Sequence, residues 1–403
     1  MIAMLLEVEY TKDIRVRKEA ESMAAGGLAV LVVVPWTKGM KREEEIKGVK
    51  ILRIGKNYTH RRKGITDLIS SILFVNWMYL FAMKKIIRTH NIQHLHVHDL
   101  PLAKTAYKLR KRIPGKVILD SHENYPELLE ALFMTKKSVL IHLKNRLFFS
   151  PKRWKRYEAS ILPKMDYLIV VIDEMHDKFI KSYNLDPKSV MVVSNYEKIE
   201  FAEKAKELEG DDEFTFEQDS FYLVYVGGIG PMRGLETVIQ SMRNLAEHRI
   251  EFLILGGGSP DYINTLKQMA VEVGAEKNIH FLGYKPFATV NYFMQSANVN
   301  VVPHIRNGHT DCTIPHKLFQ IFLSKTPVLV SSCKPLERMV NECNGGWVFE
   351  ASNPDALAQR VLEIHSADST FIKQHTNRAY EKAMNEWNWE REGGRLVNFY
   401  KTI

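Results

Sequence analysis

The feature that most restricts the fold is a strand, a glycine-rich turn and a helix start in direct succession. The apolar run Phe221–Val226 is typical of a strand, and two glycines and a Gly-Pro turn follow it. Apolar residues then recur with helical spacing from Leu235. Glycine lets the backbone approach a ligand closely, and the first amides of a helix have no partner within it. The motif favours an anion site with Arg233 in reach of a phosphate, although a plain turn of an α/β protein has the same pattern.

Apolar runs and helical segments alternate along both halves of the chain. In the first half, strands are predicted over 5–10, 28–34, 49–54, 92–98, 116–119, 167–172 and 190–193. In the second half, they are predicted over 221–226, 251–255, 279–282, 299–303 and 328–331. Continuous apolar runs are typical of parallel strands that are covered on both faces. The pattern therefore predicts two doubly wound α/β domains.

An acidic, polar segment over 197–219 separates the two halves, and we interpret it as an interdomain linker. The first domain then covers 1–196 and the second 220–370. The remaining residues, 371–403, have a helical pattern to the end, and we expect this helix to pack back toward the first domain.

The composition excludes several classes of protein. Three cysteines are too few for a disulfide framework and fit no zinc motif, which favours a reducing cytoplasm. The first residues carry neither the basic region nor the cleavage site of a signal peptide. The net charge of +9 indicates an anionic partner, which could be nucleic acid, phospholipid or a phosphorylated substrate. No nucleic-acid-binding module is recognisable, so nucleic acid is the least favoured of the three.

Two stretches of the first half combine apolar and basic residues. The apolar segment 65–83 has basic residues on both sides, but polar residues interrupt it. A buried crossover helix is favoured over a helix that touches a membrane surface, and both are favoured over a membrane span. The stretch 136–155 carries seven lysines and arginines interleaved with leucine and aromatic residues. It suits either a solvated helix face or an anionic bilayer surface.

Histidines and carboxylates follow two predicted strands of the first half. Because ligands bind at the carboxyl ends of strands in doubly wound sheets, we expect His98, Asp99, His122 and Glu123 to be neighbours. His98 also forms a His-x-His pair with His96, which invites a metal interpretation. No third ligand is evident from the spacing, so a polar strand end at a cleft is favoured over a metal site.

Several segments, taken in chain order, resemble the family-4 glycosyltransferases, whose architecture is called GT-B. They are Asp13-Ile-Arg-Val-Arg-Lys-Glu-Ala, His98-Asp-Leu-Pro, Asp120-Ser-His-Glu, Tyr225-Val-Gly-Gly, Gly256-Gly-Gly-Ser, His309-Thr-Asp-Cys-Thr-Ile-Pro-His-Lys-Leu-Phe-Gln and Thr326-Pro-Val-Leu. The resemblance implies two Rossmann-like domains that face a central cleft. The C-terminal domain would hold a nucleotide-sugar donor and the N-terminal domain an acceptor.

The resemblance also implies a donor site. Its residues would be Gly227, Gly228, Arg233, Gly257, Cys312, Thr313, Ile314, His316, Lys317 and Gln320. Arg233 matches the basic residue that contacts the diphosphate, whereas Gly228 stands where the family has a second arginine. The family's Glu-x7-Glu pair falls on Cys312 and Gln320, so neither carboxylate is kept. Gln320 can still hydrogen-bond a ribose hydroxyl, and Asp311 could contact the sugar.

The implied catalytic residues are His122, Arg233, Lys317 and Asp311, and the implied acceptor-side residues are Asp13, Arg15, His98, Asp99 and Glu123. Breaking a sugar–phosphate bond places negative charge on the diphosphate, which Arg233, Lys317 and the helix amides could stabilise. The family retains the anomeric configuration and usually needs no divalent metal. The resemblance therefore implies that neither a metal nor a cofactor is needed, and no Asp-x-Asp motif argues otherwise.

The implied function is a retaining transfer of a sugar from a UDP- or GDP-linked donor to a glycan or polyprenyl-diphosphate-linked acceptor in cell-surface polysaccharide or glycoconjugate synthesis. The expected location is the cytoplasm, including the inner face of the cell membrane. The missing carboxylates and arginine leave a non-catalytic GT-B subunit open. A nucleotide-sugar 2-epimerase also stays open, although the donor segment offers only Asp311 as an acid or base.

Overall fold

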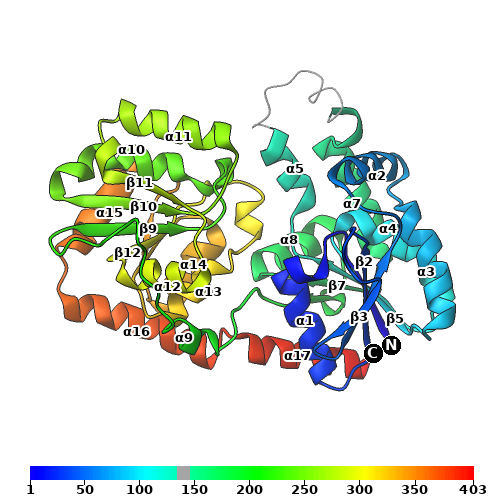
Figure 1. Ribbon diagram of the computed structural model, residues 1–403. Helices are drawn as coiled ribbons and strands as arrows, with labels where there is room; N and C mark the ends of the chain where they lie inside the picture. The colour runs from blue at the N-terminus through cyan, green and yellow to red at the C-terminus, as the bar shows by residue number, and fades with distance from the viewer. Residues whose placement is uncertain (134–145) are drawn as a thin grey trace. The chain divides into compact units, whose positions relative to one another are not determined.

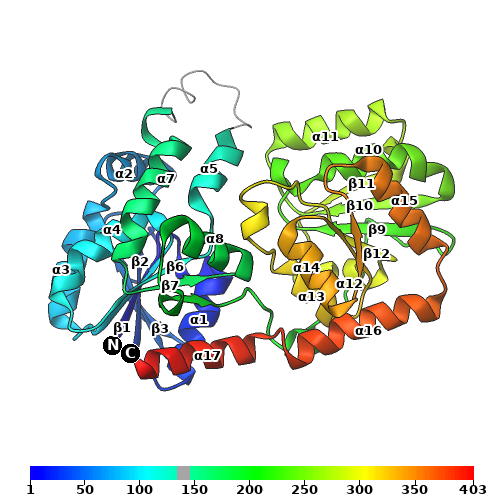
Figure 2. The same ribbon diagram turned by 180° about the vertical axis from the view of Figure 1, so that it is seen from behind.

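The computed structural model describes residues 1–133 and 146–403, and the described chain forms two compact units. The first unit combines Met1–Asn195 with Glu390–Ile403, and the second is Tyr196–Trp389. In each unit, helices cover both faces of a central sheet (Figure 1 and Figure 2). The predicted pair of doubly wound α/β domains is therefore confirmed.

The sheet of the first unit has the order β3-β4-β2-β1-β5-β6-β7-β8. Its strands are β1 (Ile2–Leu5), β2 (Val30–Pro35), β3 (Glu43–Ile46), β4 (Val49–Ile54), β5 (His94–His98), β6 (Val117–Ser121), β7 (Tyr167–Val170) and β8 (Val190–Val192). All neighbours pair in parallel except β3 with β4. The direction of the strand order reverses between β1 and β5, and ligands of such sheets bind outside the carboxyl ends of strands at that point.

Strand β1 is shorter and lies earlier than the predicted strand 5–10. The chain leaves the sheet after Leu5, and the acidic side chains that follow bind residues of other elements. The guanidinium of Arg53 lies 2.6 Å from Glu9 Oε1, and Asn76 Nδ2 donates to Glu7 Oε1 at 2.7 Å. Both carboxylates thus connect the end of β1 to neighbouring segments.

The helices of the first unit are α1 (Ile14–Ala25), α2 (His60–Leu73), α3 (Trp77–Thr89), α4 (Leu100–Leu109), α5 (Tyr125–Phe133), α7 (Pro151–Ile161), α8 (Asp173–Tyr183) and, after Trp389, most of α17 (Trp389–Thr402). Helix α1 begins where Asp13 Oδ1 accepts the amide of Val16 at 3.0 Å. This N-cap satisfies an amide that has no partner within the helix.

The predicted helix over 65–83 is two helices that bend by 85°. Phe74 ends α2 with a left-handed backbone (φ 55°), and the side chain of Asn76 caps α3. A buried crossover helix is correct for α3, which buries five side chains, but wrong for α2, which buries only Ser71. Within 1–133 and 146–403, no single helix has the length and apolar character to cross a bilayer, and only the bent α2–α3 pair meets that test jointly.

Residues 136–145 of the predicted basic stretch lie outside the described residues. The described part leads into α7 and contacts the end of α2. Arg153 donates to the carbonyl of Ile72 at 2.8 Å, and Trp154 is buried. This part of the stretch therefore serves packing between α2 and α7.

The sheet of the second unit has the order β11-β10-β9-β12-β13-β14 and is wholly parallel. Its strands are β9 (Phe221–Val226), β10 (Ile250–Leu255), β11 (Ile279–Gly283), β12 (Val299–Val302), β13 (Val328–Ser331) and β14 (Trp347–Phe349). This is the Rossmann order 3-2-1-4-5-6, with its reversal between β9 and β12. The sequence analysis did not predict β14.

The helices of the second unit are α9 (Phe201–Lys204), α10 (Leu235–Leu245), α11 (Pro260–Glu272), α12 (Phe287–Ser296), α13 (Lys317–Leu323), α14 (Lys334–Cys343), α15 (Pro354–His365) and α16 (Ser369–Asn385). The predicted C-terminal helix is thus divided into α16 and α17. Its interruption has a local cause, because the side-chain amide of Asn388 donates to the carbonyl of Met384 at 2.9 Å. The backbone amide of Trp389 donates to the carbonyl of Glu197 at 2.9 Å instead of continuing the helix.

The acidic segment 197–219 belongs to the second unit and is not a separate linker. Phe201 in α9 is buried, and Phe214 and Phe216 pack against Tyr222 and Phe293. These aromatic side chains pack the segment against the second sheet. The sequence analysis overlooked them because the segment is otherwise polar.

Candidate active site

The turn after β9 is pressed against two neighbouring loops. Gly234 has φ 69°, and a Cβ atom there would lie 1.9 Å from the carbonyl oxygen of Pro303. A Cβ atom at Gly256, after β10, would lie 1.9 Å from the carbonyl oxygen of Gly227. The amide of Ile229 donates to the carbonyl of Gly257 at 2.8 Å. Only glycine fits at Gly234 and Gly256, and these contacts fix the backbone at the strand-order reversal of the second sheet.

Three basic side chains converge at this turn. Arg233 Nη1 donates to His304 Nε2 at 2.8 Å, and Lys317 Nζ donates to the carbonyl of Val226 at 3.1 Å. Lys317 Nζ also lies 3.8 Å from the ring centroid of Tyr225. Over the described ranges, neither Arg233 nor Lys317 has an ion pair with a carboxylate. Two basic side chains without anionic partners, next to the N-terminus of α10, make a site for an anion.

Burial, and then the charge of Arg233, lowers the pKa of Lys317 well below its usual range. Burial also lowers the pKa of His304, so the imidazole is neutral and accepts the hydrogen bond from Arg233. A bound diphosphate would reverse the effect on Lys317, because an anion within a few ångströms favours the charged ammonium.

The segment between β12 and α13 holds the other predicted donor residues. Cys312 and Ile314 are buried, and Thr313 Oγ1 donates to the carbonyl of His309 at 3.3 Å. Asp311 has both carboxylate oxygens engaged, one by Arg306 Nε at 3.2 Å and the other by the amide of Lys334 at 3.0 Å. Asp311 therefore ties this segment to α14, and its geometry gives no support to the predicted sugar contact.

Glu197 is a site residue that the sequence analysis missed. Its Oε2 atom accepts from Gln320 Nε2 at 3.0 Å and lies 3.2 Å from His316 Nε2. Its Oε1 atom accepts the amide of Lys198 at 2.8 Å. A buried carboxylate thus stands beside Gln320, although neither family glutamate is kept in the donor segment. Because Glu197 lies 123 residues before Gln320 in an acidic segment, no local pattern marks it.

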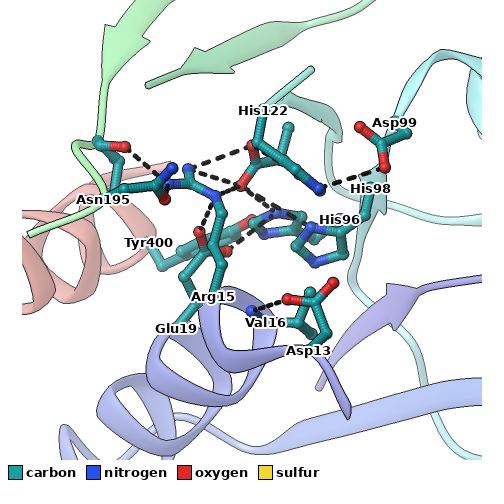
Figure 3. Close-up of polar contacts among 12 residues, drawn as sticks. Asp13, Arg15, Val16, Glu19, His96, His98, Asp99, His122, Asn195 and Tyr400 are labelled. Atoms are coloured by element: carbon teal, nitrogen blue, oxygen red, sulfur yellow. Dashed lines mark hydrogen bonds and ion pairs between the residues drawn. The ribbon is translucent and has the colours of Figure 1, made fainter. Parts of the chain in front are cut away.

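In the first unit, Arg15 lies at the centre of a buried polar cluster (Figure 3). Its Nε atom is 2.9 Å from Glu19 Oε1, and its Nη2 atom is 3.0 Å from Asp120 Oδ2. Its Nη1 atom donates to the carbonyl of Val193 at 2.9 Å and to Asn195 Oδ1 at 2.8 Å. Arg15, predicted on the acceptor side, is therefore a buried connection between α1, β6 and the segment after β8.

The pKa values of the two carboxyl groups in this cluster are shifted in opposite directions. Burial opposes ionisation of Asp120, but the charge of Arg15 holds its pKa well below the usual range. Burial, and then the charge of Asp120, raises the pKa of Glu19 well above its usual range. On the other side of the cluster, Tyr400 Oη from α17 is 2.7 Å from His96 Nδ1. The C-terminal helix thus completes a cluster built from α1, β5 and β6.

The same cluster contains the metal-ligand set that the His-x-His pair alone lacked. Glu19, His96, His98 and Asp120 each offer one ligand atom, all within 4.8 Å of one another. His96 Nε2 is 3.6 Å from both Glu19 Oε2 and Asp120 Oδ2, close to the spacing of about 3.4 Å between tetrahedral zinc ligands. The guanidinium of Arg15 already binds both carboxylates, however, so a metal ion would have to compete with a built-in cation.

His122 and Asp99 stand at the edge of the cluster that faces the carboxyl ends of the strands. His122 Nε2 is 3.3 Å from Asp99 Oδ2 (Figure 3). Burial lowers the pKa of His122, whereas burial and then the charges of Glu123 and Asp120 raise the pKa of Asp99. Asp99 has φ 65° and ψ 154°, a region that residues with a side chain rarely adopt. Its amide is held in place by the carbonyl of Asp120 at 2.9 Å.

A cavity of about 270 Å³ opens at the carboxyl ends of β1, β5 and β6. It is lined by Asp13, His98, Asp99, His122 and Glu123 among the predicted residues. The neighbours predicted from the strand ends are thus brought together, and Arg15 lies outside this lining. Glu7, Lys63, Asp67, Tyr125 and Trp154 complete the wall from other elements, and the sequence analysis did not single out Glu7, Asp67 or Trp154 for this site.

Two family models match the chain in succession. The model described as Glycosyltransferase Family 4 matches residues 14–196, and the model described as Glycosyl transferases group 1 matches residues 206–384. A similar curated protein is the putative colanic acid biosynthesis glycosyltransferase WcaL of Salmonella typhimurium. It is 23% identical over 182 residues, which are 45% of each chain. The chain matches about half the length of its first curated relatives.

Solved structures match over the whole chain. The sucrose-phosphate synthase of Thermosynechococcus elongatus superimposes with a TM-score of 0.78 at 16% identity, over 100% of this chain and 98% of that one. Anabaena HepE in complex with UDP superimposes with a TM-score of 0.68 at 10% identity, over all of both chains. At these identities the likeness shows a common fold.

Proposed function

This chain belongs to the family-4 glycosyltransferases with the GT-B fold, and we propose that it transfers a sugar from a UDP- or GDP-linked donor to a glycan or lipid-linked acceptor. The observation that carries this proposal is the pair of basic side chains without carboxylate partners among the described residues, Arg233 and Lys317, at the strand-order reversal of the second sheet. A diphosphate is the anion that a nucleotide-sugar would bring there. A structural neighbour with UDP bound supports the same interpretation.

The chemistry follows from the charge that develops on the departing diphosphate. The bond between the anomeric carbon and the phosphate oxygen breaks, and its electron pair passes to the diphosphate. Arg233, Lys317 and the N-terminus of α10 then stabilise this charge as fixed donors, which need no rearrangement during the reaction. Two protein cations are suited to the task that a divalent metal performs elsewhere, so we infer that no metal is required.

We infer that the anomeric configuration is retained, as the family resemblance implies. The acceptor hydroxyl attacks on the face from which the diphosphate leaves, its oxygen forms the new bond, and its proton passes to the departing phosphate. Neutral His122 is suited to hydrogen-bond a sugar hydroxyl at the cavity, and Asp99 orients its ring. Glu197, by accepting from Gln320, is suited to fix the side chain that meets the ribose.

We further propose that the enzyme works in cell-surface polysaccharide or glycoconjugate synthesis, as the colanic acid relative suggests, and at the cytoplasmic face of an anionic membrane. Helix α2 supports the membrane contact. Ile65, Ile69 and Ile72 lie at helical spacing and are each about half exposed. Arg61 and Arg62 precede them and are exposed, so one helix offers both apolar and cationic contacts.

Flotation with vesicles tests the membrane contact. The protein should float with phosphatidylglycerol vesicles and much less with phosphatidylcholine vesicles. Ile69→Asp should abolish flotation, whereas Val271→Asp, at an exposed position on α11 of the second unit, should not. Equal flotation with both vesicle types would contradict an anionic surface.

The donor site is tested by thermal shift with UDP-, GDP-, CDP- and TDP-sugars. A ligand that binds only the folded protein stabilises it by about 2.7 kcal/mol at a hundredfold excess over its dissociation constant. One nucleotide class should raise the melting temperature of the wild type but not that of Arg233→Ala. Arg243→Ala, an exposed position on the helix that follows the turn, is the matched control. If no nucleotide-sugar shifts the wild type, the donor-site proposal fails and a non-catalytic subunit becomes the better explanation.

A further inference from the structure

The cavity of the first unit is acidic, although the chain as a whole carries a net charge of +9. Its charged lining consists of five carboxyl groups and a single lysine. They are Glu7, Asp13, Asp67, Asp99 and Glu123, with Lys63. Burial raises the pKa of Glu7 and Asp99, so these two groups can also donate a hydrogen bond when protonated, and the excess of carboxyl groups over the single lysine favours cations and hydroxyl groups over anions.

The lysine does not change this balance, because it already has a partner. Lys63 Nζ is 3.2 Å from Asp67 Oδ2 on the next turn of α2. His122 adds no charge, since burial lowers the pKa of its imidazole. Among the described lining residues, no cation is therefore left without a carboxylate partner. The turn of the second unit differs, because Arg233 and Lys317 have none in the described part of the chain.

Aromatic side chains form another part of the cavity wall. Tyr125 and Trp154 line the cavity with their ring centroids 4.6 Å apart and their planes at 51°. Phe149 lines it as well. The negative face of an aromatic ring attracts polarised C–H bonds, and a pyranose presents such bonds on one face and hydroxyl groups at its edge.

The carboxyl groups suit the hydroxyl edge of a sugar. A carboxylate has two oxygens and can accept from two neighbouring hydroxyls, and a protonated carboxyl adds one donor. Asp99 and Glu7 are held in fixed orientations, the first by its constrained backbone and the second by Asn76 Nδ2 at 2.7 Å. Fixed acceptors of this kind discriminate sugars by the positions of their hydroxyls.

We propose that this cavity binds the terminal residue of the acceptor as a sugar without an anionic group, either neutral or amino-substituted, and rejects phosphorylated sugars and uronic acids. The proposal rests on the proposed glycosyltransferase function and specifies its acceptor. The chain then separates two chemistries, with phosphate at Arg233 and Lys317 of the second unit and hydroxyl or ammonium groups at the first.

The test is a binding measurement that does not depend on turnover. Four probes are titrated by calorimetry: n-octyl β-D-glucoside, n-octyl β-D-glucosaminide, n-octyl β-D-glucuronide and n-octyl β-D-glucoside 6-phosphate. We expect the first two to bind and the two anionic probes to bind at least about tenfold more weakly, because like charges are brought together without a counter-ion. Anionic probes that bind as tightly as the neutral one, or a failure of all four to bind, would overturn the proposal.

One variant makes the test specific. Asp67→Asn removes the partner of Lys63 and leaves an uncompensated ammonium in the cavity. The ratio of the affinity for the neutral glucoside to the affinity for the 6-phosphate probe should fall several-fold in this variant. Asp177→Asn, at an exposed position on α8, should leave the ratio unchanged. An unchanged preference in a folded Asp67→Asn protein would also overturn the proposal. If this variant does not fold, the wild-type preference decides alone.

The outcome is kept separate from that of the donor site by titrating UDP and GDP in the same preparation. Sugar discrimination without nucleotide binding would support the proposed selectivity of the cavity and contradict the proposed transferase function. Nucleotide binding without sugar discrimination would do the reverse.

Discussion

His122 Nε2 lies 3.3 Å from Asp99 Oδ2, and the Asp99 residue that makes this contact has a backbone that favours glycine, with φ 65° and ψ 154°. Such a conformation costs about 1–3 kcal/mol. It places a carboxyl group beside an imidazole at the cavity of the first unit, so the fold gives up some stability to hold the His122 ring in one orientation.

Asp99→Gly should therefore stabilise the first unit by about 1 kcal/mol, since relief of strain exceeds the added freedom of the unfolded chain. Activity should fall about 100-fold, because the ring of His122 loses its orienting group. Urea unfolding and initial rates measure the two effects. Asp99→Asn keeps the strain and should lose activity without gaining stability. A loss of stability in Asp99→Gly would contradict the argument.

Lys317 predicts a link between donor binding and protons. Its pKa lies well below the usual range in the free protein and should rise when a diphosphate binds. Between these two pKa values, binding takes up a proton, so affinity should fall about tenfold for each unit of rising pH. Calorimetry of UDP or GDP in two buffers of different ionisation enthalpy would show the uptake of up to one proton. Lys317→Met should abolish it, and the same uptake in that variant would rule Lys317 out.

Glu197 should be needed for donor binding although it lies in an acidic segment. Glu197→Ala leaves Gln320 Nε2 and the amide of Lys198 without their acceptor, which should cost about 1–3 kcal/mol of stability. The KM for the nucleotide-sugar should rise several-fold, whereas the KM for the acceptor should not change. Glu207→Ala, an exposed position in the same segment, is the control. Equal effects of both changes would show that Glu197 has no special role.

Arg15 should act on stability and not on acceptor affinity. Arg15→Met leaves Asp120 and Glu19 buried without their cation, and removal of one partner of a buried ion pair costs about 3–5 kcal/mol. Thermal melting of this variant, compared with the more exposed Arg17→Met, measures the difference. A stable Arg15→Met protein with weakened acceptor binding would restore the sequence-based interpretation of Arg15 as an acceptor contact.

The parts of the fold that could be predicted are those with local causes. The strands Val49–Ile54 and Phe221–Val226 follow directly from apolar runs. The glycines after the second run indicate the turn at which the candidate anion site lies. The alternation of strands and helices then determines which strand ends meet. His98, Asp99, His122 and Glu123 could therefore be grouped from their positions after two predicted strands, and all four line the same cavity.

The parts that could not be predicted depend on distant partners. Nothing local distinguishes Glu197 from its acidic neighbours, or shows that Arg15 points into a cluster that Tyr400 closes. The exposure of α2 could not be predicted for a related reason. The sequence of an apolar segment does not show whether another element covers it. Here the left-handed backbone of Phe74 ends α2 and changes the direction of the chain before α3.

The position of α17 has a consequence for the order of events during synthesis. Phe399 packs edge-on against Tyr167 at 5.0 Å, and Tyr400 contacts His96 in the polar cluster, so the first unit is completed by residues that follow the whole second unit in the chain. The 194 residues of the second unit lie between the two parts of the first. At about 5–20 residues per second, the ribosome needs roughly 10–40 s to make them. During that interval the buried polar cluster around Arg15 lacks its contact with Tyr400, so the first unit cannot complete its packing until the second unit has been made.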